Sequence, residues 1–242
     1  MALPPSPTRR AATARLAAKG LCAGYHGHSV VRDLDLEVDA GEVVALLGPN
    51  GAGKSTTLRA ISGVIPLLGG TVYLDGREPV ASLHRRVRDG LGVVFEERST
   101  FMRLTVAENL RVGRCDEELA VAIFPELAAL QGRLAGALSG GEQRMLTLAR
   151  ALARRPSLLL ADELSLGLAP IAVERIFRRL RAAADEHDLG ILLVEQRARQ
   201  ILSYADRAYL LIRGRTALAG PVAEVAKQIE DADLAGSRVE RQ

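Results

Sequence analysis

The sequence contains few cysteines and no long uncharged apolar run, and each scarcity excludes a class of protein. Cys22 and Cys115 are the only cysteines. They are too few and too far apart for a disulfide framework or a metal site, so we expect free thiols in a reducing cytosol. No uncharged apolar stretch approaches the roughly 18 residues that span a bilayer, so any membrane function requires other chains. Residues 1–14 lack the apolar core of a signal peptide and are expected to form a disordered tail.

A strong excess of one charge is also lacking. The 242 residues carry a net charge of +3, and the basic residues include only three lysines, Lys19, Lys54 and Lys227. The arginines are spread between acids, which is typical of a solvated surface, so no nucleic-acid partner is expected. The length and the 48% apolar content suit one large α/β domain, or one domain with a small satellite.

Against this background, one stretch stands out as a phosphate-binding loop. The apolar run 43–47 is followed by GPNGAGKS at 48–55 and then by a helix-compatible run. In this setting the GxxxxGK[ST] pattern predicts backbone N–H groups that converge on phosphate oxygens at a helix N-terminus. Lys54 would reach the β- and γ-phosphates, and the Ser55 hydroxyl would ligate Mg²⁺. The predicted ATP-binding residues here are Gly48, Pro49, Asn50, Gly51, Ala52, Gly53, Lys54, Ser55 and Thr56. The alternative is a glycine-rich turn that matches by accident, and the scarcity of lysine argues against it.

Tyr25 lies in a flexible turn, residues 23–28, about twenty residues before the phosphate loop. Two interpretations fit this position. The ring packs at the edge of a sheet, or its face stacks on a purine. With a phosphate loop so close in the sequence, stacking on adenine is the favoured interpretation.

Acidic residues follow two predicted buried strands at the point where each strand ends. Glu96 follows the strand predicted at 91–95, and Asp162 and Glu163 follow the run Leu158–Ala161. Ligands of doubly wound sheets bind beyond the carboxyl ends of strands, so Glu96 is expected to face the nucleotide's metal. Asp162 would hold Mg²⁺ through its water shell, and Glu163 would act as the base for a water.

A second helix N-terminus is predicted at residues 138–144, LSGGEQR. Ser139 is expected to cap this helix, and the two glycines behind it leave the backbone bare to receive an anion. The candidate phosphate contacts are Ser139, Gly140, Gly141 and Glu142. Residues 105–137, which precede it, show helical patterns without a strand signal, so a helical outgrowth is expected over about 102–150.

These motifs resemble the ATP-binding subunits of ABC transporters over about residues 16–222. The most specific element is LSGGEQR, which is similar to the ABC signature and lies between the phosphate loop and ADE at 161–163. Glu96 stands where most such ATPases carry glutamine, and Gln196 stands where most carry a switch histidine. Together with SLGLAP at 165–170 and LTVAENL at 104–110, these residues resemble the ATPase of branched-chain (hydrophobic) amino-acid importers. Urea and amide importers share them.

The resemblance implies a P-loop NTPase (RecA-like) α/β core with an antiparallel β-subdomain and an inserted α-helical subdomain, over residues 15–231, followed by a tail at 232–242. It implies ATP and Mg²⁺ as cofactors, with Glu163, Lys54 and Gln196 as catalytic residues. Two ATP molecules would lie between the phosphate loop of one subunit and the signature of the other, in a homodimer or in a heterodimer with a paralogue. The implied partners are integral membrane permeases and, indirectly, an extracytoplasmic solute-binding protein. The implied location is the cytoplasmic face of the cell membrane.

Three features depart from that family pattern. Leu164 replaces the usual proline and is expected to loosen the turn that leads to Ser165. Gln196 donates a hydrogen bond but carries no proton charge near neutral pH, unlike histidine. The helical region 114–130 is short for the importer subfamily, so the substrate stays open. Two alternatives remain: a soluble ABC ATPase that acts on nucleic acid, the ribosome or an assembly machine, and a nucleotide-dependent scaffold with negligible hydrolysis.

Overall fold

The computed structural model describes residues 14–79, 82–97, 99–196 and 201–239, with side chains described as far as residue 231. A six-stranded sheet with the order β5-β6-β7-β3-β8-β9 forms its centre. The first five strands are parallel, and β9 pairs antiparallel with β8. The strands are β5 (Leu91–Val94), β6 (Leu158–Asp162), β7 (Gly190–Glu195), β3 (Val43–Leu47), β8 (Arg207–Ile212) and β9 (Arg215–Pro221). Every residue of β3, β6 and β7 is buried, as expected for parallel strands that are covered on both faces.

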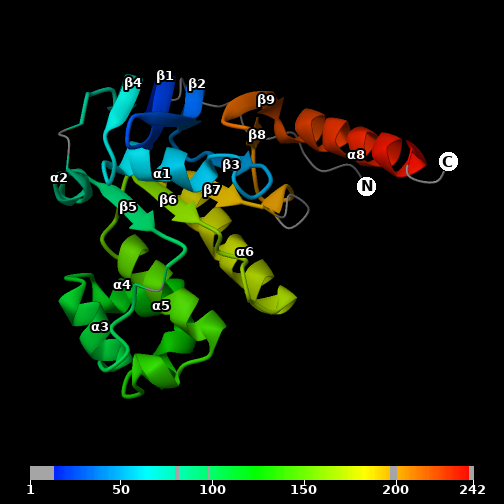
Figure 1. Cartoon of the computed structure of the whole chain (residues 1–242). Helices are drawn as coiled ribbons and strands as arrows, with labels where there is room; N and C mark the ends of the chain where they lie inside the picture. Colours follow the sequence, from blue (N-terminus) through cyan, green and yellow to red (C-terminus); the bar gives the residue numbers. More distant parts are fainter. Residues whose placement is uncertain (1–13, 80–81, 98, 197–200, 240–242) are drawn as a thin grey trace.

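A separate antiparallel sheet with the order β2-β1-β4 lies over one face of the central sheet, on the side of helix α1 (Figure 1). It consists of β1 (Ala14–Tyr25), β2 (His28–Asp39) and β4 (Leu67–Leu74). From the sequence pattern, residues 15–38 are expected to form two or three short strands, whereas β1 and β2 are 12 residues long each. Several register shifts between β1 and β2 interrupt the alternation of apolar and polar residues, which is why the pattern looked shorter than the strands are.

Helices cover both faces of the central sheet and form two cores. One core lies between the antiparallel sheet, α1 (Lys54–Ser62) and the central sheet. The other contains α5 (Gly140–Leu152) and α6 (Pro170–His187) on the opposite face. From their spacing in the sequence, Val173, Ile176, Phe177 and Leu180 are expected on one face of an amphipathic helix, and all four are buried in α6. A short helix, α2 (Leu83–Arg88), precedes β5.

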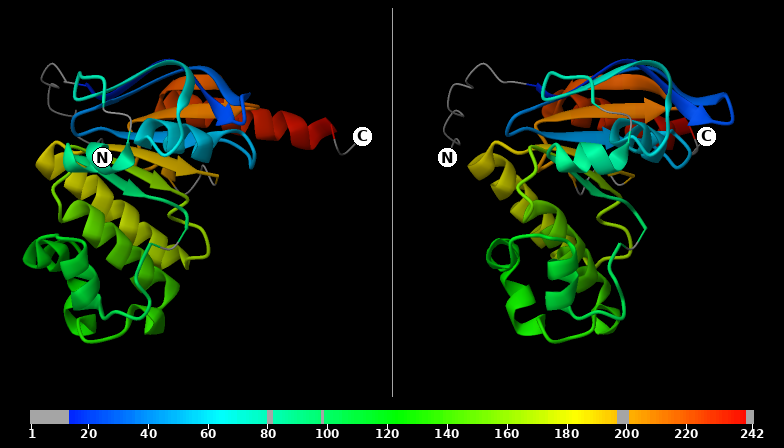
Figure 2. Two further views of the ribbon diagram at one scale, coloured as in Figure 1. Left: turned by 60° about the vertical axis from the view of Figure 1, so that its left-hand side comes forward. Right: turned by 90° about the vertical axis from the view of Figure 1, so that its left-hand side faces the viewer.

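The predicted helical outgrowth is present below the central sheet, on the side away from the antiparallel sheet (Figure 2). It contains α3 (Val106–Val112), α4 (Glu117–Ile123) and two 3₁₀ helices, η1 (Pro125–Leu130) and η2 (Ala135–Ala137), followed by α5. Capping boxes begin α3 at Thr105 and α5 at Ser139. Its buried residues, such as Phe124 and Leu127, belong to the core that α5 and α6 share, so α5 joins the outgrowth to the central sheet.

The C-terminal end differs from the predicted loose tail. Helix α8 (Val222–Val239) extends away from the body of the protein (Figure 1), so residues 232–239 continue a helix. The predicted N-terminal tail lies outside the described residues except for Ala14, which begins β1. Within the ranges that the structure describes, no helix combines the length and the apolar character needed to cross a membrane.

Candidate functional site

The predicted phosphate loop connects the buried strand β3 to helix α1, as the sequence indicated. Gly53 forms the N-cap of α1 with φ 104°, and Gly48 has φ 154°. A Cβ atom at Gly48 would lie 2.3 Å from the Leu211 carbonyl oxygen, and one at Gly53 would lie 2.8 Å from Val31 Cγ2. Both positions therefore require glycine, which leaves the backbone N–H groups at the start of α1 open to an anion.

A cavity of about 280 Å³ lies against this loop. It brings together residues that the sequence placed far apart, because β3, β6 and β7 are neighbours and their carboxyl ends meet at one edge. Its lining consists of Val30, Asn50, Gly51, Ala52, Gly53, Lys54, Ser55, Thr56, Glu96, Glu163, Leu166 and Gln196. All of these except Val30 and Leu166 were predicted site residues. Gly48 and Pro49 contribute carbonyl groups just behind the cavity.

The Lys54 ammonium is buried at the base of the loop, with 5% of the residue exposed. Its Nζ donates hydrogen bonds to the carbonyl oxygens of Gly48 (2.9 Å) and Pro49 (3.3 Å). The same Nζ lies 3.5 Å from Glu163 Oε1. A phosphate oxygen would outcompete the two neutral carbonyls for this cation, since hydrogen bonds between charged groups are stronger than those to neutral carbonyls.

Asp162, the last residue of β6, is buried without a full set of partners. Only 2% of it is exposed, and its Oδ1 has no hydrogen-bond partner among the described residues. Burial raises the pKa of Asp162 to about 6, although a hydrogen bond from Ser55 opposes this shift. The charges of Glu163 and Glu96 raise the pKa further. An unsatisfied buried carboxylate oxygen is costly unless a ligand satisfies it.

The oxygen donors around the cavity suit Mg²⁺, which takes part of its ligands from phosphate and water, better than a metal ion that is held by protein side chains alone. The described residues contain no group of three or more His, Cys, Asp or Glu side chains able to hold a metal ion by themselves. Mg²⁺ is typically bound by one or two carboxylates together with substrate phosphates and water. Asp162, Ser55 and the exposed carboxylate of Glu96 would supply such an incomplete set of ligands, as the sequence predicts.

Glu163 adopts a backbone conformation that is rare for its residue type. Its φ of +47° lies in the left-handed region, which typically costs a non-glycine residue of order 1–3 kcal/mol. Two hydrogen bonds connect it to the end of β7: its N–H donates to the Val194 carbonyl (2.9 Å), and the Gln196 N–H donates to Glu163 Oε2 (3.4 Å). The Gln196 side chain is exposed at the cavity. The structure thus brings the predicted base and the predicted switch residue side by side.

Tyr25 lies outside this cavity lining, at the end of β1. It is 39% exposed, and its hydroxyl is 3.4 Å from Arg59 Nη1 on α1. Arg59 also forms an ion pair with Glu97 at 2.6 Å. Stacking of this ring on adenine stays a prediction.

The signature residues form a separate, exposed helix N-terminus. The Ser139 hydroxyl accepts a hydrogen bond from the Glu142 N–H (3.3 Å), and the Glu142 carboxylate accepts one from the Ser139 N–H (2.7 Å). Gly140 is exposed, and a Cβ atom at Gly141 would lie 3.4 Å from Ala172 at the start of α6. The predicted cap is confirmed, but none of these four residues lines the cavity of their own chain.

Sequence reasoning assigned no role to two residues that support the site. Glu195, the last residue of β7, is 1% exposed and accepts hydrogen bonds from the Ser165 N–H (3.0 Å) and the Ser165 hydroxyl (2.7 Å). Arg144 on α5 donates to the carbonyl oxygens of Phe95 (3.3 Å) and Glu163 (3.4 Å). An acid that ends an otherwise apolar strand was the available signal for Glu195.

The substitution of leucine for proline does not loosen the turn that follows β6. Leu164 is 1% exposed and belongs to the core around α6. Ser165, the next residue, is fixed by its two hydrogen bonds to Glu195. The expected loosening is therefore wrong, because burial and hydrogen bonds replace the stiffness of proline.

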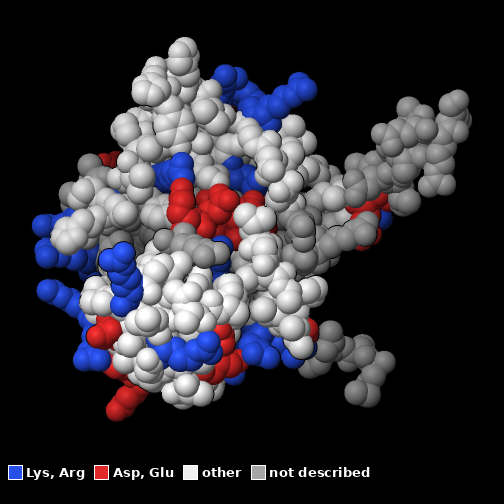
Figure 3. All heavy atoms as spheres, turned by 60° about the horizontal axis from the view of Figure 1, so that its bottom comes forward, with Lys and Arg blue, Asp and Glu red and all other residues white. Residues whose placement is uncertain are grey.

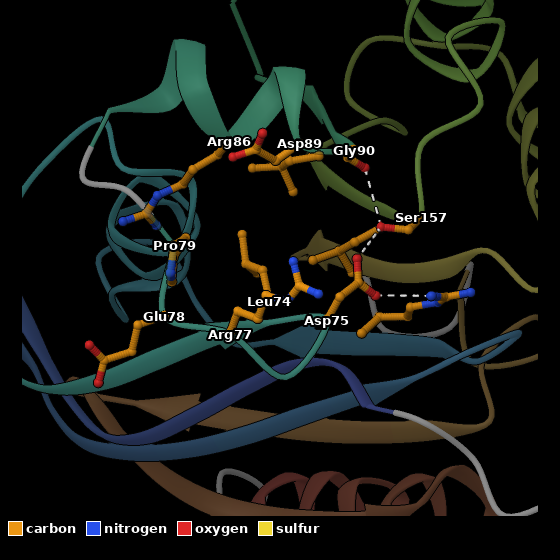
Figure 4. Close-up of a pocket in the computed structure, with 12 residues that line it drawn as sticks. Leu74, Asp75, Arg77, Glu78, Pro79, Arg86, Asp89, Gly90 and Ser157 are labelled. Atoms are coloured by element: carbon orange, nitrogen blue, oxygen red, sulfur yellow. Dashed lines mark hydrogen bonds and ion pairs between the residues drawn. The ribbon is translucent and has the colours of Figure 1, made fainter.

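A larger cavity, of about 580 Å³, lies near the amino ends of β5 and β6 (Figure 4). Its charged groups interact with one another: Asp75 accepts hydrogen bonds from Arg15 Nη1 (2.9 Å) and from the Ser157 hydroxyl (2.7 Å). Arg86 points toward the C-terminal end of α1, where it donates to the carbonyl oxygens of Ala60 and Ile61. This cavity is larger than the one at the loop, and Asp75, Ser157 and Arg86 in its lining have protein partners.

Comparisons with known proteins agree with this arrangement. A family model described as ABC transporter matches residues 31–165. The probable branched-chain amino acid transport ATP-binding protein LivF of Archaeoglobus fulgidus is 39% identical over 216 residues, which cover 85% of this chain and 91% of LivF. The high-affinity branched-chain amino acid transport ATP-binding protein BraG of Pseudomonas aeruginosa is 39% identical over 225 residues (88% and 96%). The lipopolysaccharide export system ATP-binding protein LptB of Escherichia coli is 36% identical over 227 residues (88% and 92%).

Solved structures give the same result. The ADP conformation of an ATP-binding cassette of an ABC transporter has a TM-score of 0.79 and 25% identity, and the match covers 86% of this chain and 91% of that one. An ATP-binding subunit of an ABC transporter has a TM-score of 0.77 and 28% identity, covering 89% and 93%. ATPase subunits of this family bind ATP and work with membrane permease components. The chain therefore belongs to the ABC transporter ATP-binding family and is an ATP-hydrolysing subunit of a transporter.

Proposed function

We propose that this chain powers the import of branched-chain or other hydrophobic amino acids, as a peripheral subunit at the cytoplasmic face of the cell membrane. The observation that carries the ATPase part of the proposal is the cavity in which Lys54, Glu163 and Gln196 meet at the carboxyl ends of β3, β6 and β7. The similarity to LivF and BraG supports the substrate class.

The residues of this cavity have distinct roles in hydrolysis. Backbone N–H groups at the start of α1 bind the phosphates, and Lys54 stabilises the charge that develops on them. Glu163 orients the attacking water and accepts its proton, and Gln196 donates a hydrogen bond toward the γ-phosphate. Ser55, Asp162 and Glu96 would hold Mg²⁺, which supplies further positive charge to the triphosphate.

The exposed signature supports a head-to-tail dimer, either of two copies or with a paralogue. The Ser139 oxygen already accepts the Glu142 N–H, so its own hydroxyl proton remains available to donate to a phosphate oxygen. Because Ser139 and Gly141 lie outside the cavity of their own chain, they contact the ATP bound by the partner. Each half-site is then incomplete until the two subunits close.

Mixed dimers test this assignment. We expect that Gly141→Glu in one protomer blocks hydrolysis at the phosphate loop of the opposite protomer, because the added carboxylate repels the γ-phosphate. Gly141→Ala is the matched control, since its Cβ atom would only contact Ala172. Tagged protomers that also carry Lys54→Ala allow each site to be measured separately. Unchanged hydrolysis at the opposite site would contradict the dimer.

A groove beside the helical subdomain is the proposed contact with the permease. It has a volume of about 360 Å³ and lies between β5 and α5, with Phe95, Ser99 and Arg150 in its lining. Phe101 nearby is 49% exposed, and the Arg150 guanidinium lies 5.3 Å from its ring centroid. The proposed interface includes the segment from Glu96 to Arg103, except Arg98, which lies outside the described residues. A solute-binding protein on the other side of the membrane would deliver the substrate to the permease.

The soluble alternatives receive less support. On the face shown in Figure 3, acidic side chains gather near the centre and basic ones are distributed around them, unlike the continuous basic surface that nucleic acid requires. The scaffold alternative rested on Leu164 and Gln196. Leu164 is packed in the core, and Gln196 lies at the cavity beside Glu163.

Uptake of radiolabelled leucine by the parent strain tests the proposed substrate class. Deletion of the gene is expected to abolish high-affinity leucine uptake, wild type is expected to restore it, and Glu163→Gln is not. Urea uptake, measured in parallel, distinguishes the related importers.

The similarity to LptB favours one second candidate, lipopolysaccharide export. Normal leucine uptake together with loss of lipopolysaccharide from the cell surface would contradict import and support export.

A further inference from the structure

Glu195 is a buried acid that the proposed chemistry does not use. It ends β7 directly before Gln196 and is 1% exposed. Each of its carboxylate oxygens accepts one hydrogen bond from Ser165: Oε1 from the backbone N–H (3.0 Å) and Oε2 from the hydroxyl (2.7 Å). Burying a carboxylate is costly, so a residue that keeps one here without touching the cavity requires an explanation.

The two turns that Glu195 connects both carry site residues. The turn after β6 contains Glu163 and Ser165, and the turn after β7 begins with Gln196. Three links join these turns side by side. Glu163 N–H donates to Val194 O, Gln196 N–H donates to Glu163 Oε2, and Ser165 donates twice to Glu195. The Ser165 link is the only one of the three that consists of two hydrogen bonds.

Because the Glu163 backbone is strained, the hydrogen bonds between Ser165 and Glu195 affect where the Glu163 carboxylate lies. A residue with φ +47° keeps that conformation only when its surroundings fix it on both sides. On its N-terminal side, Asp162 is fixed in β6 by pairing with Val194. On its C-terminal side, Leu164 is packed in the core and Ser165 is held by Glu195. Loss of the Glu195 carboxylate would free the C-terminal side, and the Glu163 carboxylate would move away from its place 3.5 Å from Lys54 Nζ.

We propose that Glu195 is a positioning residue for ATP hydrolysis, which holds the Glu163 turn and Gln196 in one rigid unit through Ser165. This inference rests on the proposed role of Glu163 as the base. Glu195 does not touch the nucleotide, so its removal lowers turnover and leaves nucleotide affinity unchanged. A displacement of about 1 Å in a catalytic group costs up to about 10²-fold in rate, which sets the size of the effect.

The test compares Glu195→Ala with Glu195→Gln in the purified full chain, with kcat for MgATP and the Kd of MgATP measured separately. We expect Glu195→Ala to lower kcat roughly 10- to 100-fold with a Kd within about twofold of wild type. The amide of Glu195→Gln can still pair with both Ser165 groups, so this variant is expected to keep kcat within about threefold. The matched control is Glu42→Gln, an equally buried glutamate at the other end of the sheet, which should keep kcat.

A double mutant separates positioning from a general loss of stability. In the Glu163→Gln background, Glu195→Ala is expected to lower kcat no further, because the group that it positions is already absent. Wild-type kcat in Glu195→Ala, or equal loss in the Ala and Gln variants, would overturn the inference. If Glu195→Ala does not fold, Ser165→Ala removes only the hydroxyl bond, and its kcat must then fall by a smaller factor. Normal kcat in Glu163→Gln would instead refute the proposed base, so the two failures are distinguishable.

Discussion

Two buried glutamates lie at opposite ends of neighbouring parallel strands of the central sheet. They show how the side where the strands begin, the amino edge, differs from the side where they end, the carboxyl edge. Glu42 precedes β3 and is 0% exposed, and Glu195 ends β7 and is 1% exposed. Arg207 forms a bidentate ion pair with Glu42 at 2.6 and 2.8 Å, and the Asp39 N–H adds a third hydrogen bond. Glu195 is held by the two Ser165 donors and by a backbone hydrogen bond from Leu164, with the repulsive charge of Glu163 nearby, and burial raises its pKa to about 7.

The same difference extends along both edges. At the amino edge, Asp206 accepts hydrogen bonds from Arg181 (2.8 Å) and from the Val43 N–H (2.9 Å), so its charge is neutralised within the protein. At the carboxyl edge, Asp162 Oδ1 has no partner in the described structure, and Glu163 is strained. The acids of the amino edge are therefore paired with basic residues of the protein, whereas at the carboxyl edge Asp162 keeps one oxygen open to a ligand and Glu195 is held by Ser165 outside the cavity. This comparison predicts which substitutions affect stability and which affect catalysis.

The largest expected effect is on catalysis, at the carboxyl edge. Glu163→Gln keeps the shape of the base but cannot accept a proton, so turnover should fall by about 10²- to 10⁴-fold with ATP binding retained. Phosphate release under saturating MgATP measures turnover, and calorimetry measures binding. Glu42→Gln is the control from the other edge and should leave turnover near wild type. A rate for Glu163→Gln within threefold of wild type would remove Glu163 from its role and abolish the contrast.

The next effect is on stability, at the amino edge. Arg207→Met removes the partner of a fully buried carboxylate, and breaking such a pair typically costs about 3–5 kcal/mol. Because 28% of the Arg207 side chain is exposed, we expect the lower end of that range, about 3 kcal/mol. Urea unfolding followed by circular dichroism gives the free energy. Arg207→Lys should lower the free energy of unfolding by less, since lysine keeps the charge but not the bidentate geometry. A loss below about 0.5 kcal/mol would mean that the pair is not structural.

A third prediction uses the raised pKa of Glu195. A carboxyl whose folded-state pKa, about 7, lies above its ordinary value of 4.5 takes up a proton on folding. Its stabilising contribution is complete below pH 4.5 and is lost as the pH rises toward 7. The free energy of unfolding of Glu195→Gln should therefore exceed that of wild type at pH 8 by roughly 1–3 kcal/mol. The two should converge near pH 4.5.

Urea unfolding without nucleotide or Mg²⁺ measures both curves. Asp162, whose pKa is also raised, contributes equally to wild type and variant and cancels in the difference. Parallel curves between pH 5 and 8 would show that burial does not perturb Glu195. Glu195 would then not differ from Glu42 in the cost of burying its charge.

The sequence predicted the parts of the site that depend on local pattern. The glycines at 48 and 53, the acids Asp162 and Glu163 at the end of β6 and the Ser139 cap each lie within one short segment, where spacing and residue type suffice. Parallel pairing then brings the strand ends to one edge. For this reason Lys54 and Glu163 were expected to act together, whereas the role of Gln196 was expected only from the resemblance to ABC ATPases.

The missed features depend on contacts between distant segments. Glu195 meets Ser165 thirty positions away, and Arg144 on α5 reaches the ends of β5 and β6. No spacing rule encodes these pairs, because they arise only when the strands are neighbours. The length of β1 and β2 was underestimated because register shifts break the alternation. Helix α8 was cut short at 231 because the residues beyond it, Ala232 to Val239, lack a clear apolar repeat.

The smallest effect is expected at the second cavity, where the ion pairs are partly exposed. Arg15 and Asp75 pair at 2.9 Å with side chains 25% and 38% exposed. Solvent screens such a pair, so Arg15→Gln should cost no more than about 1 kcal/mol of unfolding free energy. Part of this difference should disappear as NaCl is raised toward about 1 M, where the Debye length shrinks to about 3 Å. If Arg15→Gln instead lowered the free energy of unfolding as much as Arg207→Met does, burial of the paired carboxylate would not decide how much an ion pair contributes to stability. The hydrogen bonds that Asp75 accepts from Arg15 and Ser157 would then stabilise the amino edge as much as the ion pair between Arg207 and Glu42 does.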